Sequence, residues 1–141
     1  MFLSSFEHTV DKKGRIAIPA KWRSELGEKY YLSIPIDGQP CLTLYTQASW
    51  DALMAKIETL PMIDKLKMKR YIGFMACDVT CDAQGRILIP QNMRNYASIT
   101  ENAFVNGASD TIEIWNKENW QSQMASITPE GFFNIIKDLE I

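Results

Sequence analysis

The amino-acid sequence contains one segment twice, with corresponding positions 71 residues apart. Residues 11–26 read DKKGRIAIPAKWRSEL and align without gaps to residues 82–97, which read DAQGRILIPQNMRNYA. Seven of the sixteen positions are identical, including the core Gly-Arg-Ile-x-Ile-Pro. After a single deletion the match continues between residues 42–50 and residues 112–120. This internal duplication restricts the chain to folds built from two related units.

Each copy opens with the pattern of two short strands joined by a tight turn. Apolar and polar residues alternate over residues 6–10, as they do in a half-buried strand. Asp-Lys-Lys-Gly at 11–14 predicts the turn, because an Asp side chain can bond the backbone two residues on and Gly accepts a positive φ. Residues 15–18 form the predicted second strand, in which Arg15 lies on the face opposite to the two isoleucines.

Helices are predicted within and after each unit. Pro19 suits the first turn of a short helix that Gly27 ends, and strands at 30–35 and 42–45 follow it. Longer helices are indicated by apolar residues at helical spacing, namely Trp50, Leu53, Ile57 and Leu60, then Met68, Tyr71 or Ile72 and Met75, and finally Trp120, Met124 and Ile127.

These elements predict an α+β fold of two fused units that share one core. The expected units are residues 5–50 and 76–119, with a helical connection at 51–75 and a C-terminal helical region at 120–141. One unit of this size with four short strands is marginal alone, so the hairpins of the two units are expected to interlock. The expected result is a pseudo-twofold β-barrel with helices after each unit.

Charge is segregated along the chain. The net charge is −2, yet residues 11–23 carry +4, so the remainder carries −6. Affinity for phosphate comes mainly from Lys and Arg, and the basic segment is therefore the candidate contact with nucleic acid. No apolar run approaches the ~20 residues of a membrane span, and the N-terminus lacks the basic start of a signal peptide. We expect a cytoplasmic protein without a membrane partner.

Neither a metal site nor catalysis is expected. Cys77 and Cys81 align with Phe6 and Val10, and His8 aligns with a valine, so these residues take apolar places in the repeat. Residues four apart on a strand are also separated by roughly 13 Å, too far for one zinc ion. The sequence has no Gly-x-Ser-x-Gly elbow and no Gly-rich phosphate loop. We expect no enzyme, no cofactor and no small-molecule substrate.

The candidate binding residues are Arg15 and Arg86, which follow the turn in each copy. Arginine suits bidentate contact with guanine or phosphate. The turns themselves would be supported by Asp11, Gly14, Asp82 and Gly85. An Asp–Arg pair that only stabilises the turn, with no ligand, is the alternative interpretation. Phosphate contacts are predicted for Lys12, Lys13 and Lys21, although each also fits an ordinary solvated turn or helix. Arg23 and Arg94 lie on the short helices and are predicted to form structural ion pairs.

The motifs FEHTVDKKGRIAIPAKWR and CDAQGRILIPQNMR, with the helices between them, resemble the MraZ family of bacterial regulators. The resemblance covers nearly the whole chain. It implies two fused swapped-hairpin units of the SpoVT/AbrB type that form a β-barrel, with the arginine-bearing strands as the DNA-reading face. It also implies ring-like homo-oligomers that bind repeated operator boxes upstream of the division and cell-wall gene cluster.

The leading hypothesis is therefore a sequence-specific double-stranded DNA-binding transcriptional regulator, located in the cytoplasm at the nucleoid. Two alternatives stay open. One is an oligomeric protein-interaction scaffold in which DNA binding is secondary, and the other is an antitoxin-like regulator. Retention on heparin with a steep salt dependence is expected of the DNA-binding protein alone.

Overall fold

The computed structural model describes residues 1–140, in which eight strands and six helices follow one another. The strands are β1 (Ser5–Thr9), β2 (Arg15–Ala17), β3 (Tyr30–Ser33), β4 (Cys41–Tyr45), β5 (Ala76–Val79), β6 (Arg86–Leu88), β7 (Asn102–Ala108) and β8 (Thr111–Asn116). The helices are α1 (Ala20–Leu26), α2 (Gln47–Glu58), α3 (Met62–Met75), α4 (Gln91–Ala97), α5 (Lys117–Ser126) and α6 (Pro129–Lys137). This content confirms the predicted α+β class.

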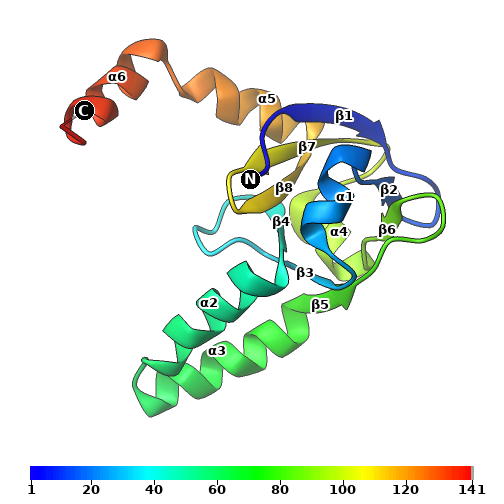
Figure 1. Cartoon of the computed structure of the whole chain (residues 1–141), viewed down its shortest axis with the longest axis horizontal. Helices are drawn as coiled ribbons and strands as arrows, with labels where there is room; N and C mark the ends of the chain where they lie inside the picture. The colour runs from blue at the N-terminus through cyan, green and yellow to red at the C-terminus, as the bar shows by residue number, and fades with distance from the viewer. Residues whose placement is uncertain (141) are drawn as a thin grey trace.

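Six strands form one antiparallel sheet in the order β1-β7-β8-β4-β3-β5. Strands β1, β3 and β4 of the first copy correspond to β5, β7 and β8 of the second. The pairing is symmetric between the copies, because β1 pairs with β7 and, equivalently, β5 pairs with β3. At the centre β4 pairs with β8, with Thr43 opposite Glu113. The first strand of each copy thus pairs with the other copy, so the six-stranded sheet is built from strands of both units (Figure 1).

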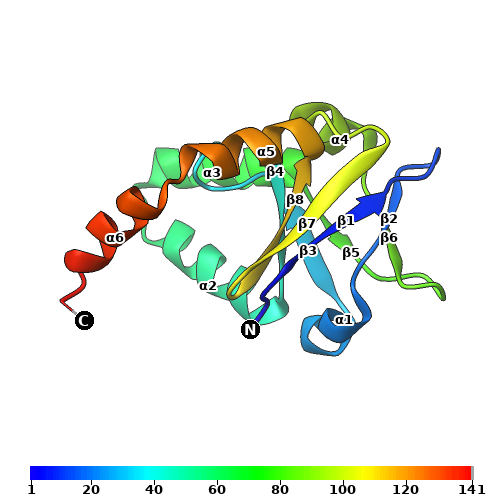
Figure 2. The ribbon, with the colours of Figure 1, turned by 90° about the horizontal axis from the view of Figure 1, so that it is seen from above.

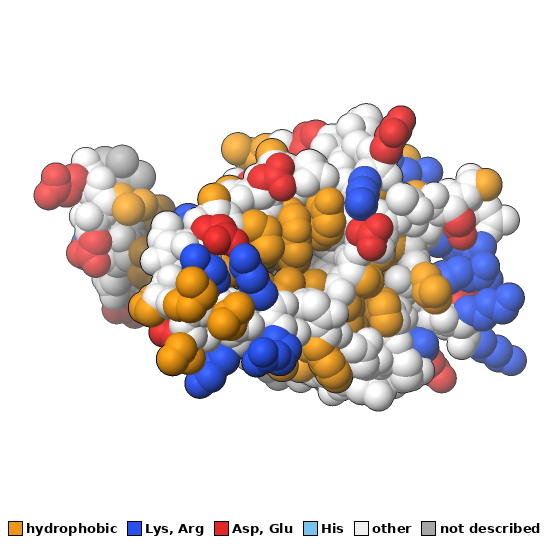
Figure 3. Space-filling model, turned by 90° about the horizontal axis from the view of Figure 1, so that it is seen from below, with side chains coloured by type: hydrophobic (Ala, Val, Ile, Leu, Met, Phe, Trp, Pro, Cys, Tyr) orange, Lys and Arg blue, Asp and Glu red, His pale blue; other side chains and the backbone are white. Residues whose placement is uncertain are grey.

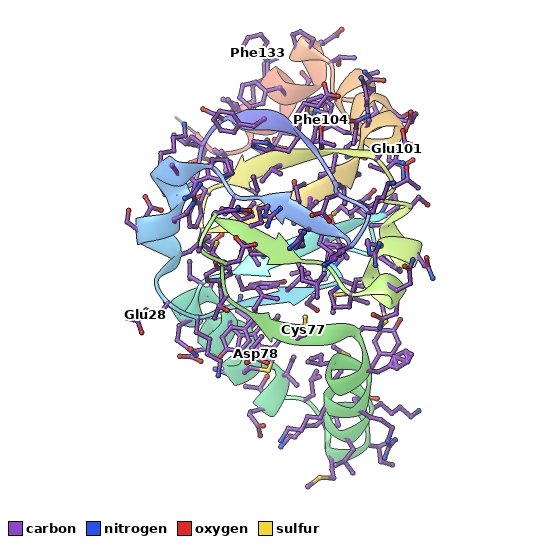
Figure 4. The ribbon with its side chains drawn as sticks, turned by 90° about the vertical axis from the view of Figure 1, so that its right-hand side faces the viewer. Glu28, Cys77, Asp78, Glu101, Phe104 and Phe133 are labelled. Carbon is purple, nitrogen blue, oxygen red and sulfur yellow. The ribbon has the colours of Figure 1, made fainter. Side chains whose placement is uncertain are left out.

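The remaining strands, β2 and β6, leave this sheet and pair only with each other. No ladder joins the edge strands β1 and β5 within residues 1–140, so the sheet is not closed into a barrel, and the predicted barrel is not confirmed. The physical reason is that the tight turns after β1 and β5 redirect the chain. The β2–β6 ribbon then covers the sheet instead of extending it (Figure 4).

The repeated isoleucines fill the space between the ribbon and the sheet. In the ribbon Ile16 lies opposite Ile87, and both are 0% exposed, as are Ile18 and Ile89. They belong to one apolar cluster with the inward residues of the sheet, such as Leu44. The ribbon is extended by reciprocal bonds: the Ile18 N–H donates to the Gly85 carbonyl, and the Ile89 N–H donates to that of Gly14.

The short helices α1 and α4 follow directly on the ribbon. Pro19 and Pro90 occupy the N-cap positions, one residue before the first turn in which Pro19 was predicted. Gly27 ends α1 with a φ of 81°, as the sequence predicts. Buried side chains on each helix, such as Trp22 and Met93, attach them to the core.

The longer helices project from the side of the sheet away from the ribbon. Thr46 caps α2 by accepting from the Ser49 N–H, and α2 and α3 form a hairpin (Figures 1 and 2). Helix α5 packs on the sheet through Trp120, which stacks on Phe104. Helix α6 then extends away from the body. No helix in residues 1–140 is long and apolar enough to span a bilayer.

Candidate nucleic-acid interface

The turn between β1 and β2 is organised by the Asp11 carboxylate. Its Oδ1 accepts hydrogen bonds from the backbone N–H groups of Lys13 and Arg15, both at 2.9 Å. The Asp11 carbonyl accepts from the Gly14 N–H at 2.9 Å, and Gly14 has a φ of 89°. A positive φ of this size favours glycine, which explains the residue at this place in the repeat.

The turn between β5 and β6 repeats this arrangement. Asp82 Oδ1 accepts from the N–H groups of Gln84 and Arg86 at 2.9 Å. The Gly85 N–H donates to the Asp82 carbonyl at 3.0 Å, and Gly85 has a φ of 77°. Both turns therefore place an arginine at the first residue of a ribbon strand, on the face opposite to the buried isoleucines.

The two arginines are held by these same carboxylates. Arg15 Nε lies 2.7 Å from Asp11 Oδ2, and Arg86 Nε lies 3.1 Å from Asp82 Oδ2. Arg86 Nη1 also lies 3.5 Å from Asp11 Oδ2. The turn-stabilising ion pair of the alternative interpretation is thus present. Each arginine side chain nevertheless stays about a third exposed, at 33% and 28%.

Hydrogen bonding favours the ionised form of both carboxylates. The pKa of Asp11 is lowered from 3.8 to about 2, chiefly by the backbone N–H of Arg15 and further by its guanidinium. The pKa of Asp82 is also lowered, chiefly by the backbone N–H of Arg86. The ionised carboxylates hold the guanidinium groups by their Nε atoms. The Nη donors of Arg15 form no ion pair within residues 1–140, whereas Nη1 of Arg86 also contacts Asp11.

The predicted phosphate contacts divide into two groups. Lys12 and Lys13 are exposed at the tip of the first turn and form no ion pair within residues 1–140. Lys21 is bound more closely to the protein: its Nζ lies 3.3 Å from Ser4 Oγ and 5.0 Å from the centroid of the Phe6 ring. Figure 3 shows Lys and Arg side chains gathered at the end of the molecule where the ribbon turns lie.

Arg23 and Arg94 make structural contacts of a different kind from those that the sequence predicted. Their predicted ion pairs are absent from residues 1–140, and this prediction was wrong. Instead Arg23 Nε donates to the Ile18 carbonyl and Arg94 Nε to that of Ile89, each at 3.0 Å. Each guanidinium lies against the turn glycine of the other copy, where a Cβ on Gly14 would be 2.5 Å from Arg94 Cζ. The recurrence of arginine in both helices was the only signal.

The cysteines and the histidine lie among apolar side chains. Cys41 is fully buried in β4, and burial raises the pKa of its thiol to about 12. Cys77 and Cys81 are half-buried against the core, and the Tyr30 hydroxyl donates to Cys81 Sγ. No group of three His, Cys, Asp or Glu residues suited to a metal ion occurs in the part of the chain that the structure describes.

The fold and the site define a duplicated α+β protein whose two copies meet at an arginine-bearing ribbon. A family model described as "MraZ protein, putative antitoxin-like" matches residues 1–69 and 74–139. A transcriptional regulator MraZ of Caldicellulosiruptor saccharolyticus is 42% identical over 146 aligned positions, which cover 100% of both chains. Proteins of the same name are 42% identical in Acetivibrio thermocellus, over 86% of this chain and 85% of the relative, and 41% identical in a Thermoanaerobacter species, over 99% and 97%. The chain belongs to the MraZ family.

Proposed function

We propose that this protein is a transcriptional regulator that binds double-stranded DNA in a sequence-specific manner. Relatives that match it over 97–100% of their length are named transcriptional regulators. We further propose that it acts as a homo-oligomer, ring-like in form, on repeated operator boxes upstream of the division and cell-wall gene cluster. Its place in the cell would be the cytoplasm, at the nucleoid. The two SpoVT/AbrB-type units would be residues 5–50 and 76–119.

One observation carries the proposal: Arg15 and Arg86 lie on the same outward face of the β2–β6 ribbon, and each is held by a carboxylate. A two-stranded ribbon fits the major groove of DNA, and the guanidinium fork matches the O6 and N7 acceptors of guanine. Because each Nε is fixed by a carboxylate, little side-chain freedom remains to be lost on binding. The turn lysines, Lys12 and Lys13, would bind the phosphates on either side of the base contact.

The test is a gel-shift titration on the DNA upstream of the chain's own gene. We expect R15A and R86A each to weaken binding tenfold or more, because a bidentate base contact is worth ~1–3 kcal/mol. R15K keeps the charge and loses the fork, so it should lose specificity while retaining affinity for random DNA. K29A is the matched control, because Lys29 is an exposed cation that pairs with Asp78 of β5 and lies outside the ribbon. Unchanged binding by the R15A/R86A double variant, with wild-type circular dichroism, would refute the proposed site.

A protein-binding function is the second candidate, and one observation favours it. Helices α3 and α6 expose several large apolar side chains, including Ile63, Phe74, Phe132 and Ile135. Apolar surface gathered in this way marks interaction sites in many soluble proteins. A scaffold or an antitoxin-like regulator would use these helices, and its retention on heparin would depend little on salt.

A further inference from the structure

Helix α6 is an amphipathic helix that the rest of the chain leaves uncovered. Its ends are well specified: the Thr128 hydroxyl accepts from the Gly131 N–H, and Pro129 occupies the first turn. None of its residues is buried. The α6 face comprises Phe132, Phe133 and Ile135 of the helix and Leu139 directly after it, which are 52%, 59%, 67% and 63% exposed. Figure 4 shows Phe133 at the outer edge of the molecule.

Helix α3 carries a second uncovered surface of a different kind. Residues spaced by three or four positions form the α3 stripe, which consists of Ile63, Leu66, Lys67, Arg70 and Phe74. Ile63, Leu66 and Phe74 are 69%, 50% and 62% exposed. The stripe faces away from α2, to which α3 is joined by bonds from Lys65 and Lys69 to Glu58. Figure 3 shows apolar and basic side chains interleaved over this hairpin.

The charges of the two surfaces are complementary. Residues 129–140 contain Glu130, Asp138 and Glu140 against Lys137, a balance of −2. Helix α3 contains four cations against Asp64, a balance of +3. Lys67 and Arg70 form no ion pair within residues 1–140, so their charge is available to a partner. Opposite charges around two apolar faces favour association and fix its orientation.

We infer that the α6 face of one copy docks on the α3 stripe of a second copy. This inference rests on the homo-oligomer of the proposed function and names the surfaces that form it. Within one chain helices α6 and α3 both extend on the side away from the ribbon, α6 toward the top of Figure 1 and α3 toward the bottom, and they stay apart. Because they are different surfaces, each contact leaves one α3 stripe and one α6 face free for further copies. Such head-to-tail contacts continue until a ring closes or a filament grows.

The experiment uses the full chain and two variants, each defective at one surface. The α6 variant is F132S/I135S, and the α3 variant is L66S/R70E. All four side chains are exposed in one copy, so the fold should survive, which circular dichroism checks. Sedimentation velocity should give a large oligomer for wild type and a monomer for each variant. Truncation of a buried apolar anchor usually weakens association by tenfold or more. I36S changes an apolar residue of the β3–β4 loop that is still more exposed, at 79%, and should leave the oligomer intact.

The decisive measurement is the mixture of the two variants. One variant keeps the α3 stripe and the other keeps the α6 face, so together they should form a heterodimer and nothing larger. A monomeric wild type, a variant that keeps the wild-type mass, or a mixture that stays monomeric overturns the inference. DNA binding is measured in a separate experiment. Both variants retain Arg15 and Arg86 and should bind a single operator box weakly. Loss of the oligomer with no effect of R15A on DNA would refute the proposed function and leave this interface standing.

Discussion

Arg86 of the second copy contacts Asp11 of the first: Nη1 lies 3.5 Å from Asp11 Oδ2, while Nε lies 3.1 Å from Asp82 Oδ2. Arg15 contacts Asp11, and no ion pair joins it to Asp82 in residues 1–140. Asp11 therefore holds both arginines, whereas Asp82 holds one. The two copies have the same aspartate and arginine here, and the aspartates contribute unequally to the ion pairs.

This inequality predicts different effects for D11N and D82N on the recognition of DNA. Each change removes one negative charge, so binding to random DNA should become slightly stronger for both. D11N releases two guanidinium groups and D82N only one, so D11N should lower the ratio of operator to random affinity more, by up to about tenfold. Gel shifts on operator and scrambled DNA at one salt concentration measure this ratio. Equal ratios for the two variants would show that the contact across the copies has no part in recognition.

The lowered pKa of Asp11 predicts a pH dependence of stability. Its pKa falls from 3.8 to about 2 on folding, so the ionised carboxylate stabilises the folded state. This stabilisation is complete above about pH 4 and is lost as the pH falls through 2. Asn keeps the acceptor for the backbone N–H groups and lacks the charge. The Tm of wild type should therefore exceed that of D11N at pH 7, and the difference should vanish near pH 2.

The control for this experiment is E28Q, which removes an exposed carboxylate that forms no ion pair in residues 1–140. Its Tm should follow wild type at every pH. A difference between wild type and D11N that stays constant from pH 7 to pH 2 would mean that the carboxylate charge does not stabilise the turn.

The turn glycines give a prediction about packing between the copies. Gly14 and Gly38 have φ values of 89° and 74°, so alanine strains the backbone at both by roughly 1–2 kcal/mol. Only at Gly14 would the new Cβ also meet the Arg94 guanidinium; at Gly38 nothing lies within 4 Å. G14A should therefore lower the free energy of unfolding by clearly more than G38A in urea titrations. Equal losses would show that Arg94 moves aside without cost.

The local elements could be predicted from the sequence because their causes are local. Alternation specified β1, the Asp and Gly residues specified the turn, and the Ile-x-Ile pattern placed Arg15 on the outer face. The contacts between copies could not be predicted in the same way. Arg94 contacts Gly14, and Arg86 contacts Asp11, because segments far apart in the sequence pair with each other. No periodic pattern of residues indicates which distant segments pair. The open sheet was not predicted for the same reason. Whether the edge strands β1 and β5 close the sheet depends on how β2 and β6 pair, which is also a contact between distant segments.

The candidate site could be predicted in its residues and not in its geometry. The repeat identified Arg15, Arg86 and their aspartates, since identity in both copies selects them. No pattern of residues predicted that Lys21 lies over the Phe6 ring, because that contact depends on how α1 packs beside β1. It likewise could not show that helix α6 is left uncovered, since an amphipathic pattern is equally typical of a helix packed on its own core.

The last prediction concerns the layout of the operator. One chain offers two outward arginines, and its basic segment at residues 11–23 carries only +4 in a protein of net charge −2. Specific binders neutralise several phosphates, so a dissociation constant near 10⁻⁸ M requires several chains side by side on the DNA. Chains joined head to tail present equivalent ribbons, each of which needs the same face of the duplex. Operator boxes should then recur as direct repeats, about 10–10.5 bp apart or at whole multiples.

Insertion of about 5 bp between two boxes rotates one of them by half a turn away from its ribbon. We expect this insertion to abolish cooperative binding, and insertion of a full turn to restore most of it. Gel shifts on both operators measure the effect, and an operator with a single box serves as the reference for uncooperative binding. The F132S/I135S variant should bind all three DNAs with the same low affinity, because its copies cannot join. If wild type binds the half-turn and full-turn operators equally well, the chains do not read the boxes as one assembly.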